Sequence, residues 1–227
     1  TPLYSSAASD VYKRQAFSVL FSTVFFVRQK QSCHSFIVSS ATSGDGKSTV
    51  CFFTALAAAQ LGQRVLLVDG DRYFPQGKIW LELLQSLPLK NPANLSEESE
   101  LLFEDLSTSQ QPLLLTENLY YFKTPDNALD PDQLMSSQSL LVLLEQWQKS
   151  YDVILIDTPP ILGLSDARLI GSQTDGIILV IRLEKTRKDH VYSALDSLNI
   201  ANLNLLGVVV NDVKKNFGSY DYGYNYY

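Results

Sequence analysis

The sequence predicts an α/β fold in which a mainly parallel, doubly wound sheet is flanked by helices, and three observations lead to this class. Short apolar runs recur along the chain, each bounded by turn or polar residues. The runs are continuous rather than alternating, as in strands that are buried on both faces of a parallel sheet. Stretches with helical character separate them, and alternating strands and helices build open sheets of this type.

The expected elements follow from these runs. Five runs rich in Val, Ile and Leu and one weaker run are the expected strands, at residues 35–40, 64–69, 152–157, 176–181, 205–211 and, for the weaker run, 119–122. The expected helices lie at residues 47–61, 134–149, 166–173 and 186–198. Residues 85–111 are rich in Ser, Glu, Asn and Pro, and we expect a surface excursion there without a catalytic role.

Length and charge narrow the class of protein. The 227 residues, 45% of them hydrophobic, are enough for one sizeable α/β core and too few for two comfortable domains. The formal net charge is −6 and no long Lys/Arg run occurs, which speaks against a nucleic-acid partner bound by bulk charge. Cys33 and Cys51 lack metal-ligand spacing and fit a reducing cytosol.

The ends of the chain differ from its centre. Residues 1–14 do not share the pattern of the rest and are interpreted as a non-native or linker segment. Residues 15–213 form the expected domain, and residues 214–227 a flexible, tyrosine-rich tail. The apolar run at residues 16–27 is too short for a membrane span, which needs about 20 residues, so we expect a buried helix.

A run of small residues with a lysine follows the first expected strand and opens the next expected helix. It reads Ser43, Gly44, Asp45, Gly46, Lys47, Ser48 and Thr49. Strand, glycine-rich loop and helix in this order are the context of a phosphate-binding loop, whose backbone N–H groups cradle phosphate oxygens. We therefore predict a site for ATP and Mg²⁺, in which Lys47 reaches the β- and γ-phosphates and Ser48 binds the metal. Ala41 replaces the usual first glycine, which the turn tolerates unless it needs a positive φ.

Acidic residues end two of the expected strands. Asp69 and Asp71 follow one strand and Asp157 follows another, so all three are expected beside the phosphate loop. There Asp157 and Asp69 can hold Mg²⁺, and one acid can accept a proton from a hydroxyl. We favour Asp69 as this base because it directly ends its strand, and Asp71 is the alternative. Asp166 is either a further acid behind the site or the N-cap of the next helix.

Together these residues resemble the bacterial tyrosine kinase family, the BY-kinases of capsule and exopolysaccharide synthesis, over residues 15–227. Residues 41–49, 65–71 and 153–160 are similar to the Walker A, Walker A′ and Walker B motifs of that family. The cluster at residues 220–227 is similar to its tyrosine-rich tail. The resemblance implies a P-loop NTPase fold of the MinD/ParA-like type.

The resemblance also implies roles for individual residues. The chain would be an ATP- and Mg²⁺-dependent protein-tyrosine kinase with Lys47, Asp69 and Asp71 as catalytic residues. Asn211 would lie near the adenine. The acceptors of autophosphorylation would be Tyr220, Tyr222, Tyr224, Tyr226 and Tyr227.

Partners and location follow from the same resemblance. A membrane-embedded polysaccharide co-polymerase or activator, fused upstream or separate, would hold the kinase in the cytoplasm at the inner face of the cell membrane. The tyrosine tails of neighbouring subunits are further expected partners.

The chain departs from the family in two places. Arg72-Tyr73 stands where the family has another residue followed by Arg. The charged residues that join subunits into a ring in that family correspond here to Gln15, Ser18 and Phe21, so ring assembly through those ionic contacts is not expected.

Two other classes of protein fit the motifs. One is a positioning ATPase like MinD or ParA, although Thr42 stands where those proteins carry a second lysine. The other is a catalytically silent ATP-binding regulator of a membrane polysaccharide co-polymerase. The intact Lys47, Asp69, Asp71 and Asp157 argue against this class.

Overall fold

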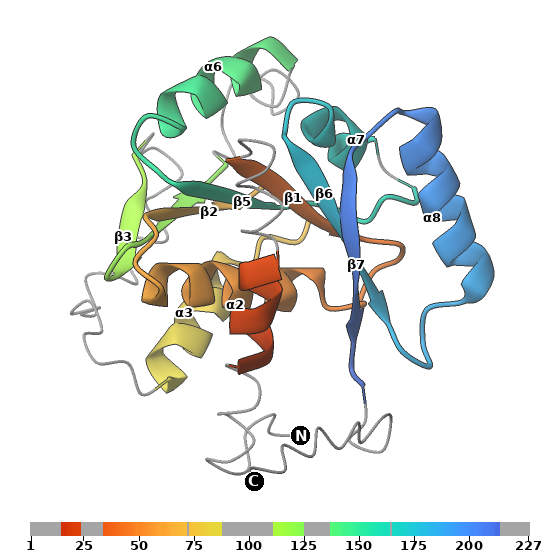
Figure 1. Ribbon diagram of the computed structural model, residues 1–227, viewed down its shortest axis with the longest axis horizontal. Helices are drawn as coiled ribbons and strands as arrows, with labels where there is room; N and C mark the ends of the chain where they lie inside the picture. Colours follow the sequence, from red (N-terminus) through yellow and green to blue (C-terminus); the bar gives the residue numbers. More distant parts are fainter. Residues whose placement is uncertain are drawn as a thin grey trace, which may run out of the picture.

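The computed structural model describes residues 15–23, 34–71, 73–87, 111–124, 137–163 and 165–213. Within these ranges the chain forms a seven-stranded sheet in the order β3-β4-β2-β5-β1-β6-β7 (Figure 1). The strands are β1 (Ser35–Ser40), β2 (Val65–Asp69), β3 (Leu113–Thr116), β4 (Leu119–Lys123), β5 (Val153–Asp157), β6 (Gly176–Arg182) and β7 (Leu205–Asn211). The helices are α2 (Lys47–Gln60), α3 (Gly77–Ser86), α6 (Ser137–Trp147), α7 (Asp166–Gly171) and α8 (Lys188–Ile200), and residues 15–23 are helical too.

All neighbouring strands pair in parallel except β3, which runs antiparallel to β4 at one edge. The central strand β1 lies between β5 and β6. In the register of the sheet, Asp69 at the end of β2 pairs with Asp157 at the end of β5, and Asp157 pairs with Val38 of β1. The sheet thereby places the acids of two strands next to the loop that leaves β1.

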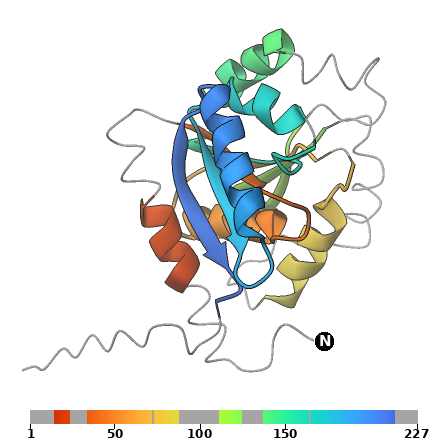
Figure 2. The same ribbon diagram turned by 90° about the vertical axis from the view of Figure 1, so that its right-hand side faces the viewer.

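Helices cover both faces of the sheet. The helix of residues 15–23, α2 and α3 pack on one face, where Phe36 and Val38 of β1 point. Helices α6, α7 and α8 pack on the opposite face with Ile37, and Figure 2 shows α8 lying along β6 and β7. Because alternate residues of one strand enter different cores, the central strands are buried on both sides.

This architecture confirms the predicted fold class. The five strong runs are strands, and the weaker run at residues 119–122 is β4. The short edge strand β3 was not predicted. Helix α8 begins at Lys188 rather than at Thr186, and α7 ends at Gly171, two residues earlier than expected. The N-cap of α7 is Ser165, so Asp166 lies in the first turn and the N-cap assignment was wrong by one residue.

Several predictions fall on residues outside the described ranges. They concern residues 1–14, Cys33, Arg72, most of residues 85–111 and the whole tail at residues 214–227. For the apolar run at residues 16–27, the part up to residue 23 is helical, and its Phe21 is buried against α2. Among the described helices, none has the length and apolar character to cross a membrane.

Candidate nucleotide site

The loop between β1 and α2 has the backbone conformation that a phosphate-binding loop requires. Gly44 and Gly46 adopt φ angles of 79° and 95°, in the left-handed region that favours glycine. Ala41 is fully buried and is not among the residues with positive φ, so alanine fits where the general pattern has glycine. Helix α2 starts at Lys47 and directs its N-terminal end at the loop.

The side chain of Asp45 holds this loop from behind. It is fully buried, and its carboxylate accepts hydrogen bonds from Thr42 N at 3.0 Å and from Thr42 Oγ1 at 3.1 Å. Thr186, in the turn after β6, donates its hydroxyl to the other oxygen of Asp45 at 2.8 Å. The carboxylate of Asp45 is therefore occupied within the protein, and Asp45 is not among the residues that line the cavity described below.

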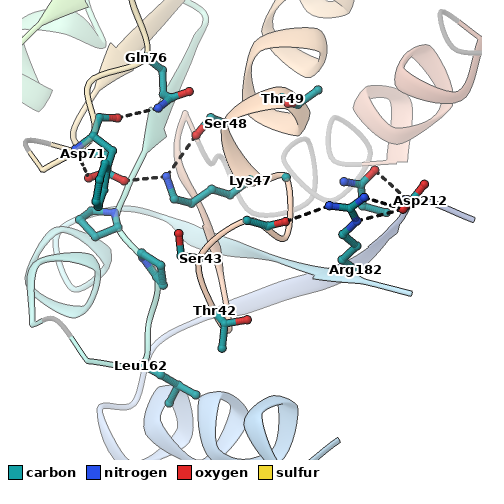
Figure 3. A pocket seen from close by; sticks show the side chains of 16 residues that line it. Thr42, Ser43, Lys47, Ser48, Thr49, Asp71, Gln76, Leu162, Arg182 and Asp212 are labelled. Carbon is teal, nitrogen blue, oxygen red and sulfur yellow. Dashed lines mark hydrogen bonds and ion pairs between the residues drawn. The ribbon is translucent and has the colours of Figure 1, made fainter. Parts of the chain in front are cut away.

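Residues from β6, β7 and the turn after β6 hold the outer side of the loop. Asn211 donates to the carbonyl oxygen of Asp45 at 2.9 Å, and Lys185 Nζ donates to that of Gly44 at 3.0 Å. Arg182 lies beside them, pairs with Asp212 at 2.8 Å and approaches the Gly44 oxygen at 3.5 Å (Figure 3). The loop is thus fixed by segments that follow it in the sequence by more than 130 residues.

Lys47 connects the loop to the acids at the strand ends. Its Nζ lies 2.8 Å from Asp71 Oδ2 and 3.5 Å from Asp157 Oδ2, and it donates to Ser48 Oγ at 3.1 Å (Figure 3). The side chain of Lys47 is 10% exposed and the two carboxylates are almost fully buried. The sheet therefore brings together the lysine and two of the three acids that the sequence predicted for the site.

Asp69 faces a different part of the structure. Its Oδ2 accepts hydrogen bonds from Gln76 N at 2.7 Å and from Gly77 N at 3.1 Å, at the start of α3. Its carbonyl oxygen accepts a bond from Thr124 Oγ1 at 2.7 Å. One oxygen of Asp69 is thereby committed to holding α3 in place, and Asp69 is not among the residues that line the cavity described below.

Two buried acids at the strand ends, Asp157 and Asp69, have raised pKa values. Burial raises the pKa of Asp157 to about 7, against the opposing charge of Lys47 and the nearby Ser48. Burial also raises the pKa of Asp69 to about 6, against the two backbone hydrogen bonds from α3. Burial disfavours the charged form of Lys47, but the charges of Asp157 and Asp71 outweigh it and its pKa is raised. Lys47 is therefore cationic at neutral pH and lies close to the carboxyl groups of both Asp71 and Asp157.

A cavity of about 760 Å³ opens above the loop, within the size range of small-molecule sites. Its floor is formed by Thr42, Ser43, Gly44, Gly46, Lys47, Ser48 and Thr49. Its walls are formed by Asp71, Phe74, Gln76, Pro159, Pro160, Leu162, Arg182, Asn211 and Asp212. Most of the predicted phosphate-binding residues and the predicted Asn211 therefore line one space.

The residues of the site fit a magnesium ion. Neither carboxylate oxygen of Asp157 has a hydrogen-bond partner in the described structure, although both are buried. The hydroxyl of Ser48 accepts a hydrogen bond from Lys47, which also lies close to Asp157. Mg²⁺ is usually held by one or two carboxylates, by waters and by the phosphates of the substrate. The described residues contain no group of three or more His, Cys, Asp or Glu side chains that could hold a metal ion by themselves.

Arg182, Lys185 and Thr186 were not singled out from the sequence. They lie at the carboxyl end of β6, which neighbours β1, and ligands of open parallel sheets bind at such ends. This rule on ligand binding could have pointed to the region after β6, but it applies to every parallel strand and does not select these three side chains. Asp166 lies outside the residues that line the cavity.

The fold and the site define a P-loop nucleotide-binding protein. The family model described as the AAA domain matches residues 35–204. The tyrosine-protein kinase YwqD of Bacillus subtilis is 30% identical over 220 residues, which cover 92% of this chain and 85% of YwqD. The chain therefore belongs to the bacterial tyrosine-protein kinase family.

Solved structures agree with this assignment. The chimerical protein CapA2B2 is 27% identical and superposes with a TM-score of 0.71, over 88% of this chain and 84% of that one. The kinase domain of the Escherichia coli tyrosine kinase ETK reaches the same TM-score of 0.71 at 23% identity, over 93% of this chain and 80% of the kinase domain. At that identity the second comparison supports the fold alone.

Proposed function

We propose that the chain is an ATP- and Mg²⁺-dependent tyrosine kinase that phosphorylates the tyrosine cluster of its own tail and regulates the synthesis of an exopolysaccharide or capsule. The observation that carries the proposal is the cluster of Lys47, Ser48, Asp71 and Asp157 at the phosphate loop, in a chain of the tyrosine kinase family. A phosphate-binding loop alone would also suit a simple ATPase.

The loop supplies the binding of ATP. Backbone N–H groups of residues 44–49 and the start of α2 hold the phosphate oxygens, and Lys47 reaches the β- and γ-phosphates. Ser48 and Asp157 would hold Mg²⁺, which neutralises charge on the phosphate oxygens during transfer. Thr49 and Ser43 complete the floor, and Asn211 and Arg182 line the wall on the side of β6 and β7.

Asp71 is better placed than Asp69 to accept the proton of the tyrosine. Asp71 lines the cavity, whereas one oxygen of Asp69 is occupied by the backbone of α3. When phosphate draws Lys47 away, the carboxylate of Asp71 loses its partner at 2.8 Å and can accept a proton. The phenolic oxygen then bonds to the γ-phosphorus, the bond from that phosphorus to the bridging oxygen breaks, and ADP leaves with the electron pair.

The tail supplies the acceptor hydroxyls. Five tyrosines lie in residues 220–227, outside the described residues, and a tail of 14 residues beginning at residue 214 can reach roughly 45 Å at ~3.3 Å per residue. A phenol with a pKa near 10 needs a carboxylate and a metal-bound phosphate to react at neutral pH. Each phosphate adds up to about two negative charges. A modified tail is therefore repelled from the acidic site.

The same proposal includes a membrane partner. The resemblance of the chain implies a polysaccharide co-polymerase or activator that holds the kinase at the inner face of the cell membrane. Co-purification of this chain with a candidate membrane protein encoded beside it, before and after treatment with ATP, tests this part separately.

The acceptor assignment is tested by mass spectrometry of phosphotyrosine after incubation with ATP and Mg²⁺. Wild type should carry phosphate within residues 220–227, and a variant with all five tail tyrosines replaced by Phe should lose most phosphate while binding ATP as before. Phosphate found mainly elsewhere contradicts the assignment. Hydrolysis without phosphotyrosine indicates a positioning ATPase like MinD or ParA, and ATP binding without hydrolysis indicates a silent regulator.

A further inference from the structure

The cavity above the phosphate loop has two chemically different ends. Toward β6 and β7 it is lined by Arg182, Asn211 and Asp212, which carry charges and hydrogen-bonding groups. At the other end the walls include Phe74, Pro159, Pro160 and Leu162. Figure 3 shows Asp71 to the left of Lys47 and Leu162 below it, with Arg182 and Asp212 to the right. A triphosphate makes no use of the apolar end, because its oxygens need donors and cations.

Phe74 is the most exposed of these apolar side chains. It is 67% exposed although its backbone is held firmly. Phe74 N donates at 3.2 Å to the carbonyl oxygen of Asp71 and at 3.2 Å to Asp71 Oδ1. Gln76 Nε2 donates to the carbonyl oxygen of Phe74 at 2.7 Å. The backbone N of Phe74 therefore holds this residue next to Asp71, the carboxylate that we propose as the base.

The segment that brings Pro159, Pro160 and Leu162 to the same cavity is equally fixed. Ser39 donates its hydroxyl to the carbonyl oxygen of Pro159 at 2.7 Å, and Ile161 N donates to the carbonyl oxygen of Ser40 at 2.8 Å. These bonds tie the segment after Asp157 to the last residues of β1, directly before the phosphate loop. Proline restricts its own backbone and that of the preceding residue, so this wall is rigid.

We propose that Phe74, with Pro159, Pro160 and Leu162, forms the subsite that holds the ring of the acceptor tyrosine. A tyrosine side chain has an apolar body and a polar tip, and this end of the cavity offers an apolar surface beside the carboxylate of Asp71. A ring held against these side chains directs its hydroxyl toward Asp71 and Lys47, where phosphate is bound. Phe74 is then a positioning residue, and Asp71 remains the group that takes the proton.

The subsite rests on the proposed kinase function and predicts a specific kinetic change. A contact made equally with bound substrate and transition state changes KM and leaves kcat unaltered. Phe74→Ala should therefore raise the KM for an acceptor peptide by at least about tenfold while kcat changes little. Phe74→Tyr or Phe74→Trp should restore the wild-type KM, because each keeps an aromatic ring at that position.

The experiment uses the full chain and a synthetic peptide of residues 214–227 in which Tyr222 is kept and the other tyrosines are Phe. Phosphorylation of the peptide is followed by mass spectrometry over a range of peptide concentrations, and ATP affinity is measured by titration calorimetry. Leu162→Ala removes part of the same apolar surface and should raise the same KM. Ile79→Ala is the matched control, since Ile79 is 49% exposed in the neighbouring α3 and does not line the cavity.

Each outcome has a distinct meaning. An unchanged peptide KM in Phe74→Ala, with active wild type, overturns the subsite and leaves the kinase function standing. Weaker ATP binding in Phe74→Ala, in parallel with the lost transfer, shows that Phe74 serves the adenine and also overturns the proposal. A wild-type chain that binds ATP and transfers no phosphate to the peptide or to its own tyrosines refutes the kinase function itself.

Discussion

The hydroxyl of Thr186 donates a 2.8 Å hydrogen bond to the carboxylate of Asp45, and the two residues lie 141 positions apart in the sequence. The same hydroxyl accepts a bond of 2.8 Å from Arg182 N. Asp45 lies in the phosphate loop, and Thr186 lies in the turn after β6. This pair therefore fixes the loop to the opposite side of the site without touching the cavity itself.

Replacing Thr186 by Val should loosen the phosphate loop. The variant keeps the shape of the side chain but leaves Asp45 and Arg182 N without this partner. A lost hydrogen bond to a buried charge is worth about 1.5–3 kcal/mol, and we expect a loss of this order in urea unfolding. ATP affinity should fall as well. Thr186→Ser keeps the hydroxyl and should behave like wild type; equal stability of Val and Ser variants would contradict this role.

Lys47→Met should abolish transfer and lower stability while the fold is retained. Loss of one charge at the transferring phosphate should reduce the rate by at least about 100-fold. Removing one partner of a buried ion pair costs up to about 3–5 kcal/mol, and here Asp157 can lessen the loss by taking up a proton. The measurements are phosphotyrosine formation, urea unfolding and far-UV circular dichroism. Wild-type transfer in this variant would show that Lys47 has no part in the chemistry.

The sequence was sufficient to predict the centre of the sheet, because its strands are buried on both faces. The run Ser35–Ser40 is buried throughout, and a short continuous run of this kind is typical of a strand at the centre of a parallel sheet. Strand β3 was missed because it is a short edge strand of four residues that is only half buried, so its pattern is weak. The start of α8 was predicted two residues early because Thr186 belongs to the turn after β6, where its backbone N donates to the carbonyl oxygen of Arg182 at 2.9 Å.

Site residues that belong to a local sequence motif could be predicted, whereas roles that depend on tertiary contacts could not. Lys47 and Ser48 follow from the loop motif, whatever the rest of the chain does. The favoured role of Asp69 as base rested on its place at the strand end. The structure shows that the start of α3 takes one of its oxygens, a contact that no local pattern reveals. The approach of Lys185 to Gly44 likewise depends on the neighbouring positions of β1 and β6.

Asp157 should make the nucleotide-free protein less stable as the pH rises. Its folded pKa of about 7 lies above the usual aspartate pKa of 3.8, and the pKa of Asp69, raised to about 6, acts in the same direction. Between about pH 4 and 7 the folded state holds more protons than the unfolded chain, so the free energy of unfolding falls with rising pH. Urea unfolding from pH 4 to 8, without nucleotide, measures this slope.

Asp157→Asn removes the main titrating group of that window. We expect the stability of the variant relative to wild type to increase by roughly 1–3 kcal/mol between pH 4 and pH 8. The variant should also lose Mg²⁺-dependent ATP binding, because an amide lacks the charge that the metal needs. A pH slope equal to that of wild type would show that Asp157 does not take up a proton in the folded protein.

Gly46 should tolerate alanine much less well than Gly62, although both residues have positive φ. Gly46 has φ 95°, and a Cβ there would clash with Asn211 Nδ2. Gly62, after α2, has φ 84° and nothing within 4 Å of such a Cβ. Gly62→Ala therefore carries only backbone strain, about 1–2 kcal/mol. Gly46→Ala carries the same strain and also displaces Asn211 from the carbonyl oxygen of Asp45.

We expect Gly46→Ala to lower the free energy of unfolding by about 1 kcal/mol more than Gly62→Ala, because one hydrogen bond is lost in addition. It should also weaken ATP binding, which Gly62→Ala should leave unchanged. Combining Gly46→Ala with Asn211→Ala tests the cause, since removal of the Asn211 amide relieves the clash and the two losses should not add. Full additivity, or equal losses in the two glycine variants, would show that the contact with Asn211 does not shape the loop.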